Sequence, residues 1–107
     1  MTTFDDREKA FEQKYKHDQD MLFRIQNRRN KLLGIWAAEL MGMTGAEAES
    51  YVKDVIMSDM EKPGDEDVHD KVYADLHEKN IDLSDHRLRK KMDELLQDAH
   101  DQVVSET

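Results

Sequence analysis

The sequence predicts an all-α protein, a four-helix bundle with an amphipathic N-terminal arm. Composition favours helices, because 38% of the 107 residues are charged and only 4 are Gly and 1 is Pro, the two residues that most often interrupt a helix. The hydrophobic pattern agrees, since apolar residues recur at intervals of three, four and seven along most of the chain. A chain of this length forms one modest core, so a large internal active-site cleft is not expected.

The first predicted helix runs from Phe4 to Met41. It contains no Pro, its only Gly is Gly34, and it ends at Gly42, a residue type that is common just past a helix C-terminus. Its second half is expected to face the core through a wide apolar stripe of Leu22, Ile25, Leu32, Leu33, Trp36 and Leu40.

The second helix is expected to open at Thr44. Thr44 and Glu47 have the spacing of a capping box, in which each side chain binds the backbone amide of the other residue. Pro63 and Gly64 break the chain after this helix. The buried face is predicted to consist of Ala48, Tyr51, Val52, Val55, Ile56 and Met60.

Two further helices complete the predicted bundle. The acids at 65–67 place negative charge at the start of the third helix, where the helix dipole favours it. Asn80 ends this helix, and Asp82 or Ser84 caps the fourth. Short connections between the helices imply an antiparallel bundle. The apolar stripes are Val68, Val72 and Leu76 in the third helix, and Leu88, Met92, Leu95, Leu96, Ala99 and Val103 in the fourth.

Residues 1–19 are predicted to form an N-terminal arm, separate from a bundle domain of residues 20–107. A helix from Phe4 to Met41 would be about 57 Å long, whereas helices of roughly 15 to 20 residues reach only about 23 to 30 Å. The surplus length is expected at the N-terminus, because residues 1–20 are rich in charge and poor in groups that could join a core. We expect this arm to be disordered or frayed in the free protein.

The arm nevertheless carries a pattern of its own. Phe4, Phe11, Tyr15 and Leu22 follow one another at intervals of seven, four and seven, so they would lie on one face of a helix. Docking into a groove of a partner would fold the arm, with the aromatic side chains as anchors. The pattern alone leaves a second interpretation open, in which this stripe packs on the bundle and lengthens it.

Composition also excludes several classes of function. A net charge of −9 disfavours general nucleic-acid binding, which depends on Lys and Arg. The absence of Cys removes disulfides, thiolate nucleophiles and Cys-ligated zinc. No signal peptide and no apolar run of about 18 residues is present, so we expect a cytoplasmic protein without membrane insertion. Without a Gly-rich phosphate loop or a nucleophile motif, no enzymatic activity is expected.

A dense basic cluster precedes the second helix, formed by Arg24, Arg28, Arg29 and Lys31. It could bind an acidic surface or a nucleotide phosphate of a partner, or it could pair with the acidic second and third helices. We favour internal pairing, and interpret the basic run at 87–91 in the same way.

The five histidines do not form a recognisable metal site. None has the spacing of two His with a Glu that marks a zinc protease. His69 and His77 lie eight residues apart and are expected to be exposed to solvent. The sequence therefore predicts no metal and no cofactor, and leaves weak nucleotide binding open.

Six segments in order and at matching spacing carry a resemblance to a known family. They are Phe4-Asp-Asp-Arg-Glu8, Ala10-Phe-Glu12, His17-Asp18, Arg28-Arg-Asn-Lys-Leu-Leu-Gly34, Trp36-Ala-Ala-Glu-Leu40 and Gly64-Asp-Glu-Asp-Val68. Together they resemble the ATPase inhibitor subunit zeta family. The resemblance implies a subunit of the alphaproteobacterial F-type ATP synthase that is a monomer when free, and is peripherally associated with the inner membrane through the synthase.

The same resemblance implies an inhibitory mechanism. The arm would fold as a helix in a catalytic interface of the αβ head, close to the γ rotor, and block ATP hydrolysis, so that the α, β and γ subunits are the expected partners. The competing hypothesis is a structural or scaffolding module that binds a protein complex through its bundle surface without inhibiting it. The positions carried over as partner contacts are Phe4, Asp5, Asp6, Arg7, Glu8, Phe11, Glu12 and Tyr15.

Overall fold

The computed structural model confirms the all-α fold and the predicted order of four helices. It describes the backbone of residues 3–61 and 64–106, and the side chains of residues 18–61 and 64–106. Among the helices of this described part, none carries an apolar stretch long enough to span a bilayer. The helices are α1 (Thr3–Leu40), α2 (Gly45–Glu61), α3 (Asp65–Glu78) and α4 (Asp85–Glu106).

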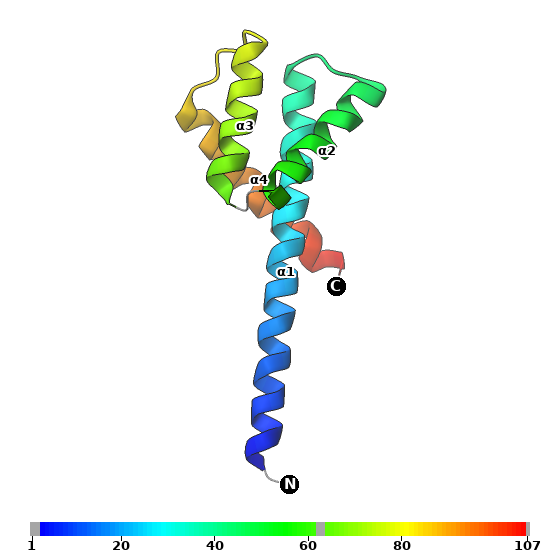
Figure 1. The fold of residues 1–107 in the computed structure, drawn as a ribbon, viewed down its shortest axis with the longest axis vertical. Coiled ribbons are helices and arrows are strands. Elements are labelled where there is room, and N and C mark those ends of the chain that lie inside the picture. Colours follow the sequence, from blue (N-terminus) through cyan, green and yellow to red (C-terminus); the bar gives the residue numbers. More distant parts are fainter. Residues whose placement is uncertain (1–2, 62–63, 107) are drawn as a thin grey trace.

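Helix α1 is the axis of the molecule, and its N-terminal half projects beyond the bundle (Figure 1). The other three helices pack around its C-terminal half, with α2 and α4 making most of the contacts. The molecule measures 64 × 26 × 23 Å, so α1, about 57 Å long at ~1.5 Å per residue, sets its length. The predicted overhang is therefore confirmed. The predicted fraying of the arm falls largely on residues 1–17, whose side chains lie outside the described part.

Three predicted helix boundaries are confirmed by their local geometry. Gly42 and Asn80 adopt φ values of 74° and 64°, in the left-handed region that ends a helix. Ser84 caps α4, because its Oγ accepts a hydrogen bond of 3.1 Å from the amide of Arg87. The predicted opening of the second helix at Thr44 is confirmed, since α2 begins at the next residue, Gly45. The capping box itself is wrong, because Thr44 and Glu47 do not exchange the reciprocal side-chain bonds, and Gly45 has a left-handed φ of 56°.

The buried face of α1 differs from the predicted stripe. Leu33, Ala37 and Ala38 are buried, whereas Leu22 is 54% and Leu40 is 43% exposed. The prediction followed the large apolar residues, but the neighbouring helices approach α1 over its small ones. Ile25, Leu32 and Trp36 are half-buried at the margin of this face.

Helices α3 and α4 bury most of the residues expected of them, whereas α2 buries only two of its six and leaves Ala48, Val52 and Ile56 half-buried. In α2, Tyr51 and Val55 are buried, whereas Met60 is exposed, because it lies near the end of the helix where the bundle no longer covers it. The stripes of α3 and α4 are confirmed except for Leu96, which is half-buried. They supply Val68, Val72, Leu76, Leu88, Met92, Leu95, Ala99 and Val103.

Gly34 marks the close approach of α1 and α2 and leads to a first prediction. A Cβ atom at this position would lie 3.0 Å from the Cα and 3.3 Å from the Cγ2 of Val52, so a side chain requires the backbone of α2 to move. We expect Gly34→Ala to lower the free energy of unfolding by about 1–2 kcal/mol, because overpacking outweighs the gain of ~1 kcal/mol in helix propensity. Urea denaturation measures this, with Lys31→Ala as the exposed control; a variant more stable than the wild type would contradict the close approach.

Candidate functional site

The positions predicted to contact a partner all lie in the projecting half of α1. The backbone is helical from Thr3, so the intervals of seven and four between Phe4, Phe11 and Tyr15 place these positions on one helical face. Their side chains, and those of the neighbouring predicted contacts, lie outside the described residues. The complete set is Phe4, Asp5, Asp6, Arg7, Glu8, Phe11, Glu12 and Tyr15.

Where the arm meets the bundle, the structure contains a groove that the sequence did not predict. Its volume is about 530 Å³, and Phe23 of α1 with Ile56 and Met60 of α2 form its apolar wall. Phe23 and Met60 are each more than half exposed. Helical periodicity predicted that Met60 lies in the core and gave no prediction for Phe23. The spacing of apolar residues along one helix does not indicate where the neighbouring helices end. We call this site the junction groove.

A polar network lies beside the junction groove, and two of its members, Asp59 and Asp65, also line the groove. Arg29 is 2% exposed and donates hydrogen bonds of 2.8 Å to Asp65 Oδ1 and to Asn30 Oδ1. The Asn30 side chain, also buried, donates in turn to Asp59 Oδ2 at 2.9 Å. Since Asp59 belongs to α2 and Asp65 to α3, the network ties both helices to α1. The predicted pairing of the basic cluster with the second and third helices is therefore confirmed for Arg29.

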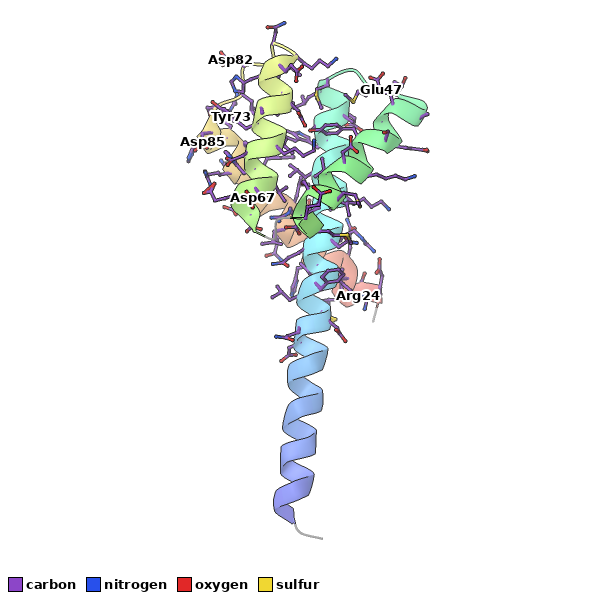
Figure 2. All side chains as sticks on the ribbon, in the orientation of Figure 1. Arg24, Glu47, Asp67, Tyr73, Asp82 and Asp85 are labelled. Carbon is purple, nitrogen blue, oxygen red and sulfur yellow. The ribbon has the colours of Figure 1, made fainter. Side chains whose placement is uncertain are left out.

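Two other residues of the basic cluster pair with the end of α4 instead. Arg28 donates to Gln102 Oε1 at 2.8 Å and to Glu106 Oε1 at 2.7 Å, and Arg24 lies 3.5 Å from Glu106 Oε2. Figure 2 shows Arg24 beside the C-terminal turn of α4, at the level where the arm leaves the bundle. For these two arginines the predicted partner helices were wrong, because the sequence does not indicate where α4 ends along α1.

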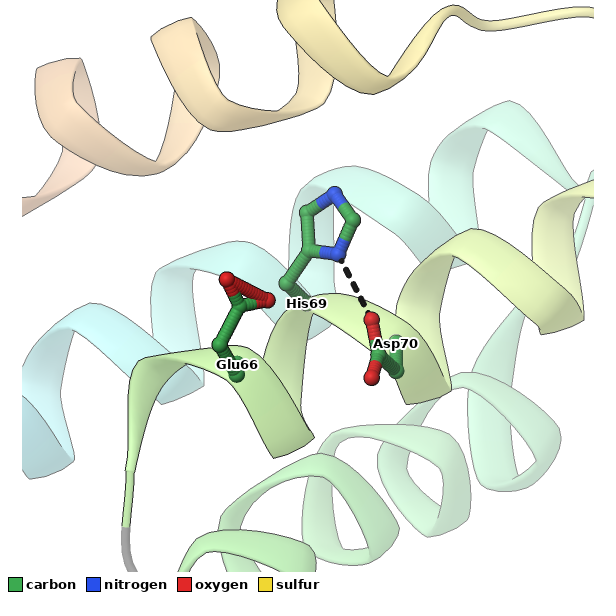
Figure 3. A group of neighbouring side chains, drawn as sticks. All are labelled: Glu66, His69 and Asp70. Atoms are coloured by element: carbon green, nitrogen blue, oxygen red, sulfur yellow. Dashed lines mark hydrogen bonds and ion pairs between the residues drawn. The ribbon is translucent and has the colours of Figure 1, made fainter.

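A third polar group lies at the start of α3, where Glu66, His69 and Asp70 offer ligand atoms within 4.8 Å of one another (Figure 3). The predicted exposure of His69 is wrong, since only 3% of it is exposed, whereas His77 is exposed as expected. His69 is buried because its position on α3 faces the start of α4. Its ring also stacks on Tyr73 with 5.7 Å between centroids.

Most polar atoms of this group already have partners within the protein. His69 Nδ1 lies 3.0 Å from Asp70, and Nε2 lies 2.8 Å from Asp85 Oδ1, an ion-pair distance without the alignment of a hydrogen bond. Arg89 binds Glu66 and Asp85 at 3.0 and 3.1 Å, and its hydrogen bond is the main cause that lowers the pKa of Asp85. A divalent ion would have to displace Arg89, so we interpret the group as a clasp between α3 and α4.

The fold defines a class, that of small helical bundles in which one long helix projects beyond the others. The chain matches the family described as ATPase inhibitor subunit zeta over residues 1–102, and it belongs to this family. It is also similar to a solved chain titled "Solution NMR structure of the protein", with 39% identity, a TM-score of 0.69, and coverage of 81% of this chain and 99% of that chain. No curated protein matches it.

Family membership confirms the resemblance drawn from the six sequence segments. It supports a role as an inhibitor of the F-type ATPase and association with the ATP synthase, and an inhibitor subunit is not itself catalytic. The positions that make the contacts and the way in which inhibition arises belong to the proposal below.

Proposed function

We propose that this chain blocks ATP hydrolysis by inserting its N-terminal arm, residues 1–19, into a catalytic interface of the αβ head near the γ rotor. The observation that carries the proposal is the projection of α1 beyond the bundle as a helix. Membership of the inhibitor family supplies the target. The α, β and γ subunits are the proposed partners, and the synthase would hold the chain at the membrane surface.

The dimensions of the molecule favour the arm as the inserted element. A single helix with its side chains is about 10–12 Å across, whereas the bundle is 26 × 23 Å in cross-section. A cleft between two subunits can therefore admit the arm while the bundle stays outside as a stop. A helix wedged there would oppose the closing motion that hydrolysis requires, with no chemistry of its own.

Substitution of Phe11 tests this proposal. We expect Phe11→Ala to weaken inhibition of ATP hydrolysis by the isolated catalytic head about 30-fold, because an aromatic anchor at the centre of an interface contributes about 2 kcal/mol. Lys9→Ala is the control, since position 9 lies on the opposite side of the helix, and its effect should stay below about threefold. Equal inhibition by Phe11→Ala and the wild type would contradict insertion of this face.

The scaffolding hypothesis has one observation in its favour. The junction groove exposes Phe23 and Met60 on the bundle itself, and exposed apolar patches often bind partners. If scaffolding is the function, a chain without residues 1–19 should bind the synthase as tightly as the full chain in a pull-down and should leave hydrolysis unchanged.

A further inference from the structure

A second groove lies between α1 and the start of α4, on the bundle rather than on the arm. Its volume is about 290 Å³. Trp36 of α1 and Leu83, which precedes α4, supply apolar surface. Arg87, Lys90, Lys91 and Glu94 of α4 also line it, and their spacings of three and four place them on one face of that helix. We call this site the Trp36 groove.

The Trp36 groove concentrates positive charge in an acidic protein. Lys91 lies 3.6 Å from Glu94 and 5.7 Å from the centroid of the Trp36 ring. Arg87 and Lys90 are exposed, and their side chains contact no carboxylate of the residues that the structure describes. The predicted internal pairing of the run 87–91 is therefore wrong for these two residues. Three cations against one carboxylate give the groove a positive charge, whereas the whole chain carries −9.

Arg89, in the same run, is paired within the protein and serves as a comparison. Its guanidinium binds both Glu66 and Asp85, and these two carboxylates raise its pKa. Arg87 and Lys90 lie on another side of α4, above Trp36 and away from the clasp. Their charge is thus available to a ligand.

We propose that the Trp36 groove binds a short acidic segment of a partner protein. The carboxylates of the segment would pair with Arg87 and Lys90, the arginine through both of its terminal nitrogens, and an apolar side chain between them would pack on Trp36 and Leu83. A small inorganic anion would leave the apolar wall unused. A nucleic acid or an anionic bilayer extends far beyond the groove and would meet the acidic remainder of the surface, so the segment must be short.

Trp36 is the only tryptophan of the chain, so its fluorescence reports on the groove directly. The probe is a synthetic pentapeptide with one leucine between two pairs of glutamates, and the control peptide carries glutamines in their place. With the full chain we expect a saturable fluorescence change from the acidic peptide alone. Raising the salt concentration from about 0.05 M to about 0.3 M should lower the affinity for the acidic peptide severalfold, because exposed ion pairs are screened.

Two double variants that each remove two positive charges test whether the peptide binds in the Trp36 groove. Replacing both Arg87 and Lys90 by glutamine should lower the affinity for the acidic peptide about tenfold. Each exposed ion pair contributes up to about 1 kcal/mol, which is about fivefold in affinity. The control, Lys53→Gln with Lys79→Gln, removes the same charge from exposed positions of α2 and the end of α3 and should change affinity less than about twofold.

Several results would overturn the proposal. An equal loss in both double variants would mean that only the net charge matters. A comparable response to the glutamine peptide would remove the role of the carboxylates. Saturation by inorganic phosphate at the same concentrations would identify a small-anion site, and tighter binding to phosphatidylserine vesicles through Arg87 and Lys90 would identify a membrane surface. None of these readouts involves the arm or ATP hydrolysis, so the two proposals fail independently.

Discussion

Deleting residues 1–19 is expected to abolish inhibition of ATP hydrolysis while the bundle stays folded. The arm projects away from the bundle (Figure 1), and among residues 18–61 and 64–106, whose side chains the structure describes, the buried ones begin at Arg29. Its removal should therefore change the free energy of unfolding by no more than about 0.5 kcal/mol, the usual range for changes away from the core. The concentration needed for half-inhibition should rise by more than about 100-fold, because every proposed anchor is lost together.

The measurement compares the full and the shortened chains in two assays. Hydrolysis by the isolated catalytic head reports on inhibition, and urea unfolding followed by far-ultraviolet circular dichroism reports on the bundle. A shortened chain that inhibits as strongly as the full one would place the inhibitory surface on the bundle, and the junction groove would be its first candidate. A shortened chain that unfolds would show that the arm belongs to the folded domain.

The sequence predicted helix boundaries better than helix faces. Gly42 and Asn80 were assigned correctly, and Ser84 was one of two candidate caps, because the left-handed turn and the side-chain cap are local features. The buried face of α1 was wrong in part, because Ala37 and Ala38 owe their burial to the close approach of other helices. A large apolar side chain is buried only where a neighbouring helix covers it. The local sequence does not indicate where that helix packs.

The polar sites show the same division. Internal pairing of the basic cluster could be inferred from composition and charge, but the partner helix was correct only for Arg29. The burial of His69 depends on which turn of α3 faces α4. The junction groove had no sequence signal either, since it depends on where the last turns of α2 and the start of α3 lie against α1. The arm positions were found from spacing and resemblance, and they stay predictions.

Replacing Arg29 is expected to cause the largest loss of stability among the polar residues. Its guanidinium is buried and satisfies both Asp65 and Asn30. Asp65 is 66% exposed, so it would regain water after the substitution, and the usual penalty of a stranded buried charge does not apply in full. The Asn30 oxygen, in contrast, is buried and would lose its donor, which costs about 1–3 kcal/mol.

Two substitutions separate these contributions. Arg29→Met keeps much of the volume of the side chain and should lower the free energy of unfolding by about 1–3 kcal/mol, the cost of the unsatisfied Asn30 oxygen. Arg29→Ala also creates a cavity and should lower it by about 3–5 kcal/mol. Arg24→Ala is the control on the same helix: its salt bridge to Glu106 is exposed, so we expect a loss below about 1 kcal/mol. Urea unfolding of the three variants measures these losses. If Arg29→Met were as stable as the wild type, the hydrogen bonds of Arg29 would not contribute to stability, and packing alone would hold α2 and α3 to α1.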